Sequence, residues 1–307
     1  MTTSMTRRAA LGATAAIPAA ALLPAAAAAD AHTGPAGKSR SFVLGDMEVS
    51  VLLAGTSLFE RDMQEIFGMN VGADTFGAVS EDAFIPTDRA QFFFQPTVAR
   101  AGGEVILFDT GTSAEGLIAA LESAGMTPGD VTTVVITHMH GDHVSGLMRE
   151  GEPTFGDVRY VTGEAEMNAW AEQGGDAYAN NVEPLRDRFE LIADGAEVAP
   201  GVIATAMFGH TPGHMGYRLS SGDRQVMVAA DMTNHYVWSL AYPDWEVRFD
   251  MDKEAAAETR RRILDMVATD RIPMIGYHMP FPGVGFVEKG TGDAAFRWVP
   301  ESYQLML

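Results

Sequence analysis

Four residues that commonly bind metal ions lie within six positions of one short stretch, Thr137-His138-Met139-His140-Gly141-Asp142-His143-Val144-Ser145. In an extended turn, His138 and His140 project to the same side, so both imidazoles reach one cation. Asp142 and His143 follow the bend at Gly141. The stretch therefore predicts two neighbouring metal ions. The alternative is three core or surface histidines beside a turn aspartate.

The other candidate ligands are isolated in the sequence, but each follows an expected strand. Val202–Met207 leads to His210, Gln225–Ala230 to Asp231, and Pro273–Tyr277 to His278, as Val131–Ile136 leads to the His138 turn. Strand ends that converge on one edge of a sheet are where α/β proteins build sites. We therefore expect these residues to meet. Asp109 ends the expected strand Glu104–Phe108 in the same way.

The remaining elements are less informative about chemistry. Gly55–Asp88 shows no sustained periodicity and is predicted to be a long loop, a lid rather than a disordered segment. Val144–Glu150 is expected to open a helix, and Arg260 to Arg262 to form a solvated helix face rather than a substrate clamp. Further strands and helices are predicted at Ser41–Leu44, Glu48–Leu53, Phe92–Ala99, Ser113–Ala124, Val158–Val161, Glu164–Gln173, Ala177–Arg188, Met215–Leu219 and Lys253–Ala268, the last capped by Asp252.

Composition excludes several classes of protein. The 307 residues contain no cysteine, so a thiolate metal site, a disulfide framework and a cysteine nucleophile are all excluded. A formal charge of −20 repels phosphate backbones and anionic membranes, which argues against nucleic-acid substrates. With 47% hydrophobic residues the chain can bury a full core. We predict one domain, at residues 41–307, that carries the metal site.

The first 29 residues resemble an export signal. Thr6-Arg7-Arg8 precedes an Ala-rich apolar run, and Ala25 to Ala29 offers cleavage sites. The paired arginines indicate a twin-arginine leader, with an ordinary secretory leader as the alternative. Residues 30–40 read as a linker. We therefore expect a periplasmic or secreted protein with no membrane segment in its mature form.

Four motifs occur in the order of the metallo-β-lactamase superfamily, which the chain resembles over roughly residues 41–307. They are H-x-H-x-D-H at His138–His143, G-H-T-P-G-H at Gly209–His214, Ala230-Asp231 and Tyr277-His278. The resemblance implies an α/β fold of the αββα sandwich type, with two mixed sheets flanked by helices. It also implies a first metal held by His138, His140 and His210, and a second held by Asp142, His143 and His278, with Asp231 bridging them. Asp109 would orient a ligand from behind, and His214 is expected to be a hydrogen-bonded core histidine rather than a ligand.

The implied chemistry is hydrolysis with two divalent ions, zinc by default, although manganese, iron or cobalt suit the same ligands. A water shared by the ions would be the nucleophile, and Asp142 is the candidate proton shuttle. The chain looks closest to the methyl parathion hydrolase and acyl-homoserine lactonase branch, so neutral esters, lactones or phosphotriesters are the expected substrates. An iron-dependent persulfide-type dioxygenase and a non-catalytic metal-binding protein are the alternatives.

One departure from that branch concerns the loop after Asp231. Its lactonases place a tyrosine three residues after the bridging aspartate, whereas this chain has Asn234 there and Tyr236 two positions on. His235 is either a pocket donor or a surface histidine, and Trp170 matches a pocket tryptophan of methyl parathion hydrolase. The sequence leaves open whether any of these contacts substrate, and whether the chain forms a homodimer.

Overall fold

The computed structural model describes residues 37–301, all of which belong to one compact unit spanning Ala31–Leu307. The predicted export signal and most of the predicted linker lie outside the described residues. Within residues 37–301, no helix combines the length and the apolar character needed to cross a membrane.

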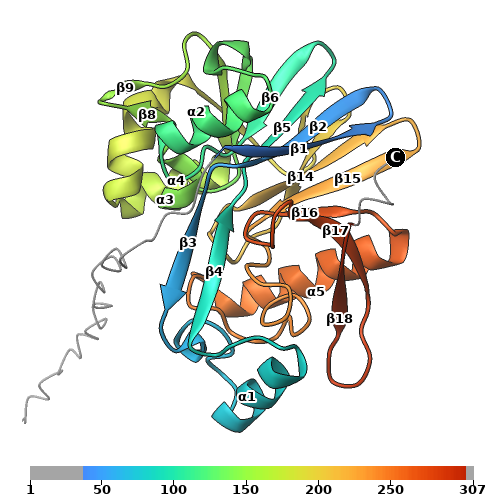
Figure 1. Ribbon diagram of the computed structural model, residues 1–307. Coiled ribbons are helices and arrows are strands. Elements are labelled where there is room, and N and C mark those ends of the chain that lie inside the picture. Colours follow the sequence, from blue (N-terminus) through green and yellow to red (C-terminus); the bar gives the residue numbers. More distant parts are fainter. Residues whose placement is uncertain (1–36, 302–307) are drawn as a thin grey trace, which may run out of the picture. The chain divides into compact units, whose positions relative to one another are not determined.

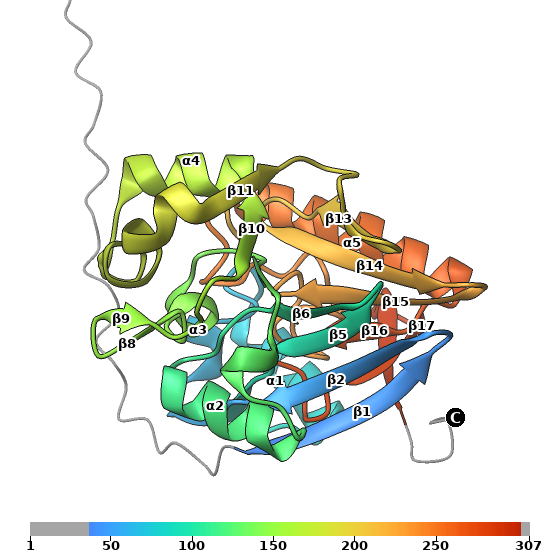
Figure 2. The ribbon, with the colours of Figure 1, turned by 90° about the horizontal axis from the view of Figure 1, so that it is seen from above.

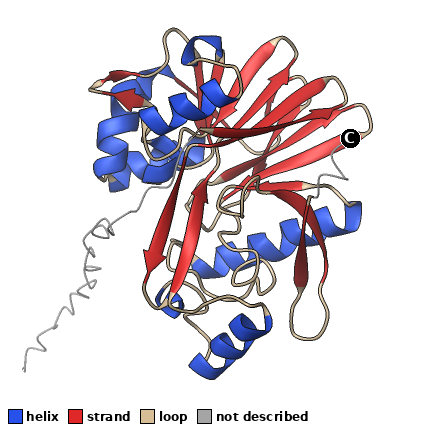
Figure 3. Cartoon of the chain, in the orientation of Figure 1, coloured by secondary structure: helices blue, strands red, loops and turns tan. Residues whose placement is uncertain are grey.

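Two seven-stranded sheets, each mixing parallel and antiparallel pairs, form the centre of the fold (Figure 3). The first sheet has the order β1-β2-β5-β6-β7-β10-β11, and its strands are β1 Lys38–Leu44, β2 Met47–Leu53, β5 Thr97–Ala101, β6 Glu104–Phe108, β7 Thr133–Ile136, β10 Arg159–Gly163 and β11 Phe189–Ile192. The second follows chain order, and its strands are β12 Glu197–Ala199, β13 Val202–Ala206, β14 Met215–Ser221, β15 Arg224–Ala230, β16 Met274–Gly276, β17 Val284–Lys289 and β18 Phe296–Pro300.

The two sheets face each other across a shared apolar core. Val49, Phe108 and Val135 of the first sheet and Tyr217 and Val228 of the second belong to one buried cluster. Burial of such side chains contributes about 1.5–3 kcal/mol each, which makes this interface the main source of cohesion between the sheets.

Helices cover the two outer faces (Figures 1 and 2). Helices α2, Ala114–Ser123, and α4, Glu164–Gln173, pack on the first sheet, and helix α5, Lys253–Asp270, packs on the second. The order of layers is therefore helix, sheet, sheet, helix, which confirms the predicted αββα sandwich.

Local sequence explains the elements that were predicted correctly. The four residues of β7 are β-branched and buried, as a strand covered on both faces requires. Ser113 caps α2 by accepting a hydrogen bond from the Gly116 amide, and Asp252 caps α5 by accepting one from Ala255.

The prediction of a long loop at Gly55–Asp88 is wrong. This segment contains strand β3, Gly55–Glu60, a 3₁₀ turn at Met63–Glu65 and helix α1, Ala73–Asp82. Strand β3 pairs with β4, Arg89–Phe94, in a two-stranded ribbon that extends from the sandwich in Figure 1. Phe67 and Phe76 pack on Trp238, whose indole N–H donates to Ser80 at 2.9 Å. These partners come from a distant segment, so local periodicity does not reveal them.

Three other predicted elements also differ from the structure. The strand expected at Phe92–Ala99 is interrupted at Gln95-Pro96, because a proline cannot donate to a strand ladder. The expected helix at Val144–Glu150 is instead the single turn α3, Gly141–Val144, followed by the small hairpin β8, Met148–Arg149, and β9, Glu152–Pro153. Ala177–Arg188 is helical, but as a π turn at Tyr178–Val182 and a 3₁₀ helix at Glu183–Arg188. A further 3₁₀ turn occupies Pro128–Asp130.

Candidate metal centre

The seven predicted ligands gather at one edge of the sandwich, where strands of both sheets end. The turn after β7 carries His138 and His140, and the single helical turn α3 that follows carries Asp142 and His143. The second sheet supplies the others: His210 after β13, Asp231 directly after β15, and His278 after β16. The ligand atoms lie in two groups, each within 4.8 Å: His138, His140 and His210 in the first cluster, and Asp142, His143, Asp231 and His278 in the second cluster.

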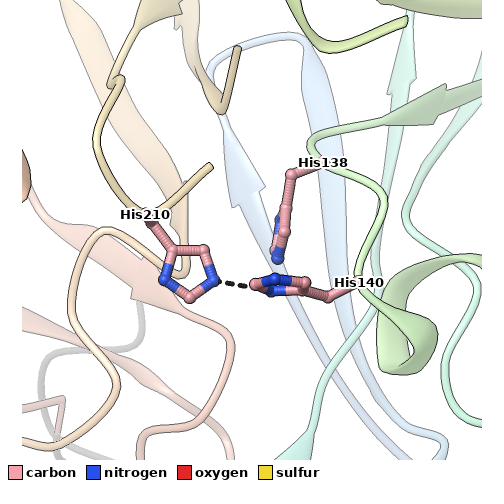
Figure 4. Close-up of side chains that lie close together, drawn as sticks. All are labelled: His138, His140 and His210. Carbon is pink, nitrogen blue, oxygen red and sulfur yellow. Dashed lines mark hydrogen bonds between the residues drawn. The ribbon is translucent and has the colours of Figure 1, made fainter. Parts of the chain in front are cut away.

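The first cluster consists of three imidazoles (Figure 4). His140 Nδ1 lies 2.9 Å from His210 Nε2, and the ring of His138 stands nearly perpendicular to both other rings, at 83° and 84°. His138 and His210 are buried. Three ring nitrogens that converge in this way form a geometry suited to a divalent cation.

Asp231 lies between the two clusters. Its Oδ2 is 3.4 Å from His210 Nε2 in the first cluster and 3.0 Å from His278 Nε2 in the second. Its Oδ1 is 3.2 Å from His143 Nε2. Asp142 Oδ2 completes the second cluster, at 3.5 Å from His143 Nε2 and 3.3 Å from His278 Nε2. The carboxylate of Asp231 can therefore be shared by two cations.

Groups behind the histidines fix which ring nitrogen faces the site. His143 Nδ1 is 2.8 Å from Asp109 Oδ2, and His210 Nδ1 is 3.1 Å from Asp250 Oδ1. His278 Nδ1 is 2.9 Å from the Phe93 carbonyl. Because each Nδ1 faces an acceptor, Nε2 is the ring nitrogen that points into the site, as metal ligation requires. The expected orienting role of Asp109 is confirmed.

The two clusters have opposite electrostatics. Burial, followed by the charge of His210, lowers the pKa of His140 to about 3, and burial lowers the pKa of His138 well below its usual value. Burial also disfavours a charged His278, but the carboxylates of Asp231 and Asp142 together outweigh it and raise the pKa of His278 to about 9. Burial disfavours a charged Asp231 as well, yet His278 and His143 together hold the pKa of Asp231 well below its usual value.

The loop that carries His210 lies directly against two helices. A Cβ at Gly213 would fall 2.0 Å from the Glu166 amide nitrogen in α4, and a Cβ at Gly209, where φ is +124°, would fall 2.1 Å from the Ala256 nitrogen in α5. Only glycine permits this approach. The G-H-T-P-G-H motif is thus also a packing motif that places His210.

Sequence reasoning missed Asp250 and placed Arg260 wrongly. Arg260 is fully buried rather than part of a solvated face; it donates to Asp250 Oδ2 at 2.7 Å and to the Pro243 carbonyl at 2.8 Å. Asp250 thus connects His210 to a buried guanidinium. Arg261 lies on the exposed side and pairs with Asp244, as predicted for a solvated face. A capping pattern marks Asp252, but no local signal identifies Asp250.

Glu166 is a second buried carboxylate that the sequence did not reveal. It lies on α4 and is 0% exposed. Its oxygens accept hydrogen bonds from the Met139 amide and from the loop that carries His210. Burial raises the pKa of Glu166. The only sequence signal is an acidic residue in the first turn of a helix, which is ordinary on a surface.

The remaining candidates lie around the clusters. His214 belongs to neither cluster, and its Nε2 accepts from the Asp231 amide at 3.1 Å, which confirms a hydrogen-bonded core histidine. Asn234 Nδ2 donates to Asp231 Oδ2 at 3.0 Å. His235 Nδ1 accepts two backbone amides, and Trp170 meets His140 edge-on with 5.8 Å between ring centroids.

A cavity of about 320 Å³ opens beside the second cluster. His278, His235 and Tyr236 line it on one side. Its other lining residues are mostly apolar. Most of them belong to β3, to β4 or to the segment just before β4: Leu58, Ile85, Pro86, Arg89, Ala90, Gln91, Phe93 and Pro280. Small-molecule sites commonly have this size and character.

Comparison with known proteins supports the same fold. A family model described as the metallo-beta-lactamase superfamily matches residues 96–274. AidC, a dizinc quorum-quenching lactonase solved with its product, is 22% identical, with 87% of this chain and 98% of that chain covered and a TM-score of 0.77. AbOPH, a hydrolase of the beta-lactamase superfamily, is 21% identical, with 88% and 99% covered and a TM-score of 0.79.

Curated relatives match over shorter stretches. The anti-Pycsar protein Apyc1 of Paenibacillus sp. is 28% identical over 155 residues, which are 47% of this chain and 62% of that protein. Ribonuclease Z of Pyrococcus furiosus is 45% identical over 53 residues, which are 17% of this chain and 16% of that protein. The chain thus spans less than two thirds of the first of these relatives and about one sixth of the second.

Proposed function

This chain belongs to the metallo-beta-lactamase superfamily, and we propose that it is a dinuclear metal-dependent hydrolase of neutral esters or lactones. The observation that carries the proposal is the convergence of two ligand clusters on the single carboxylate of Asp231. The fold neighbours described as lactonases and hydrolases support the same reaction class.

The residues present fit a pair of cations. His138 Nε2, His143 Nε2 and Asp231 Oδ1 are buried and have no hydrogen-bond partner among the described residues. A buried polar atom without a partner costs about 1–3 kcal/mol, and more when it is charged. Cations at the two clusters would satisfy all three atoms, since each faces the space between the ligands.

His138, His140 and His210 would hold the first cation and Asp142, His143 and His278 the second, with Asp231 shared. Histidine and carboxylate ligands favour zinc, although manganese, iron and cobalt suit the same set. When bound, two divalent cations supply the acidity that ionises water near neutral pH and the positive charge that stabilises a developing oxyanion.

The chain's own groups would complete the reaction. The side chain of Asp142 is 26% exposed, whereas that of Asp231 is 4% exposed, so Asp142 is the carboxylate that substrate can reach. Burial disfavours a charged Asp142, but His143 and His278 outweigh it and lower the pKa of Asp142 to about 2, so it is ionised and able to accept a proton. We assign it the transfer of that proton to the leaving group.

The cavity beside His278 supports a small, neutral and partly apolar substrate. Its wall carries a single formally charged side chain outside the ligand set, that of Arg89, and a volume near 320 Å³ suits a molecule of the size of an acylated lactone or an aryl ester. The formal charge of −20 opposes binding of a polyanion such as RNA, which is the substrate class that the name ribonuclease Z indicates. The comparisons do not favour the dioxygenase alternative, and we do not retain it.

A substrate panel tests the proposal. The zinc-loaded full chain is assayed against aryl esters, lactones of several chain lengths and phosphotriesters, with metal content measured in parallel. Hydrolysis of an ester or lactone by a protein that holds two metal ions per chain is expected. One metal per chain, or no turnover of any of these compounds, contradicts the proposal.

We also propose export through residues 1–29, which N-terminal sequencing of the mature protein tests.

A further inference from the structure

We propose that Glu166 is a positioning residue that joins the two loops of the first cluster and so sets the geometry of its cation site. This inference rests on the proposed function, because it concerns how tightly the first of two cations is held. Neither the metal ligands nor the substrate cavity include Glu166.

One carboxylate oxygen binds the ligand turn after β7. Glu166 Oε1 accepts from the Met139 amide at 2.8 Å, and Met139 lies between His138 and His140. The same oxygen accepts from the Trp170 indole N–H at 2.6 Å. Since the Trp170 ring lies edge-on to His140, this oxygen restrains His140 both through the backbone and through its neighbouring ring.

The other oxygen binds the loop that carries His210. Glu166 Oε2 accepts from the Thr211 hydroxyl at 2.7 Å and from the Gly213 amide at 2.9 Å. Thr211 directly follows His210. A single buried carboxylate therefore spans a ligand turn from the first sheet and a ligand loop from the second.

This arrangement explains how His140 and His210 are held 2.9 Å apart although they come from different sheets. Three of the four hydrogen bonds to the Glu166 carboxylate come from these two loops, and the fourth comes from Trp170 on the same helix as Glu166, so the carboxylate restrains the two loops relative to each other. Groups that orient ligands from behind typically contribute about 10- to 100-fold to metal affinity. The second cluster has no contact with Glu166 among the described hydrogen bonds and is positioned by Asp109 instead.

Glu166→Gln tests the inference. The amide replaces one acceptor oxygen with a donor, so two of the four donors lose their partner. We expect zinc affinity, measured on the full chain by chelator competition, to fall about 10- to 100-fold for one of the two cations and to stay unchanged for the other. Glu166→Asp should recover part of the loss. Glu164→Gln, on an exposed residue of the same helix, is the matched control and should bind as the unmodified chain does.

A second background shows which cation is affected. His210→Ala removes a first-cluster ligand, so Glu166→Gln should add no further loss to the cation that remains. Should Glu166→Gln fail to fold, Thr211→Val and Trp170→Phe each remove one donor and should weaken the same cation, by less.

Two results overturn the inference. If the unmodified chain binds two zinc ions and Glu166→Gln, or both donor variants, bind them equally tightly, Glu166 is only a structural residue and the proposed function stands. If the unmodified chain binds no zinc, the proposed function fails and the inference fails with it.

Discussion

The two clusters of candidate ligands share one carboxylate but differ in the charge that they offer a cation. The first cluster has three imidazoles, and burial lowers the pKa of two of them, His138 and His140, whereas the second combines two imidazoles with the carboxylates of Asp142 and Asp231. The second cluster thus has the negative charge to hold a cation by itself, and the first depends on Asp231 for charge and on its surroundings for geometry. We expect the second cluster to bind zinc first and more tightly.

Removing the shared carboxylate should weaken both clusters, and the first more, because the second retains Asp142. Asp231→Ala is expected to lower metal content at both and to reduce hydrolysis by more than the ~100-fold typical of residues that only orient ligands. Metal analysis and initial rates on the variant measure this. Asp223→Ala, in the exposed turn between β14 and β15, serves as the control. Retention of two metals by Asp231→Ala would show that the clusters are independent.

The support behind the first cluster should have a large effect on stability. Arg260→Met leaves Asp250 buried without its guanidinium partner, and breaking such a pair costs about 3–5 kcal/mol. Arg261→Met, one residue on, breaks only the exposed pair with Asp244 and should change the free energy of unfolding by about 1 kcal/mol or less. Urea unfolding gives the free energy of unfolding of both variants and so tests this difference. Equal effects would mean that burial of Arg260 is energetically unimportant.

Substitution of the carboxylates behind the histidines, Asp109 and Asp250, should have a smaller effect, and each should affect only one of the two clusters. Asp109→Asn replaces the carboxylate behind His143 with a neutral amide, and Asp250→Asn does the same behind His210, so each position loses its charge and one of its two acceptor oxygens. Each should weaken zinc binding about 10- to 100-fold, the former at the second cluster and the latter at the first. Asparagine tolerates the φ of +64° at position 109, so backbone strain does not confuse the comparison. Two-site zinc titrations of the paired variants give the answer; loss at the same site in both would contradict the assignment.

The smallest test compares protonation in the metal-free chain. With a pKa of about 9, His278 should be charged at pH 7.5, and its contribution to stability is present below pH 6.5 and lost as pH rises through 9. With a pKa of about 3, His140 should be neutral, and its burial costs stability as pH falls below 6.5 toward 3. NMR titration of the imidazoles of chelator-treated protein resolves both. Titration of both groups near 6.5 would abolish the proposed electrostatic contrast.

The convergence of the seven candidate ligands was predictable from sequence because their signals are local. Four of them lie in one turn, and His210, Asp231 and His278 each follow a strand with a clear apolar pattern. Strand ends meet at a sheet edge regardless of side-chain detail, so the order of strands and ligands along the chain is enough to predict that these residues converge.

The supporting groups were not predictable, because their roles depend on tertiary contacts. Asp250 and Glu166 look like surface acids in sequence, and Arg260 stands within a run of three arginines, yet all three are buried. The prediction of a long loop at Gly55–Asp88 is wrong for the same reason. Phe67 packs on Trp238 and Phe76 packs on Trp245, and both tryptophans lie far away in the sequence. Sequence periodicity indicates which face of a helix or strand is buried, but it does not indicate which residues are buried by a distant segment of the chain.

Neither half of the sandwich contains a complete set of candidate metal ligands. Residues up to β11 supply His138, His140, Asp142 and His143, and the rest of the chain supplies His210, Asp231 and His278, so each cation would bridge the two sheets. Metal binding and the docking of the sheets are then thermodynamically linked: free zinc at about 100 times its dissociation constant would add about 2.7 kcal/mol per site against separation of the sheets. By reciprocity, loosening of the buried interface at Val49, far from any candidate ligand in the sequence, should make the protein a poorer competitor for scarce metal.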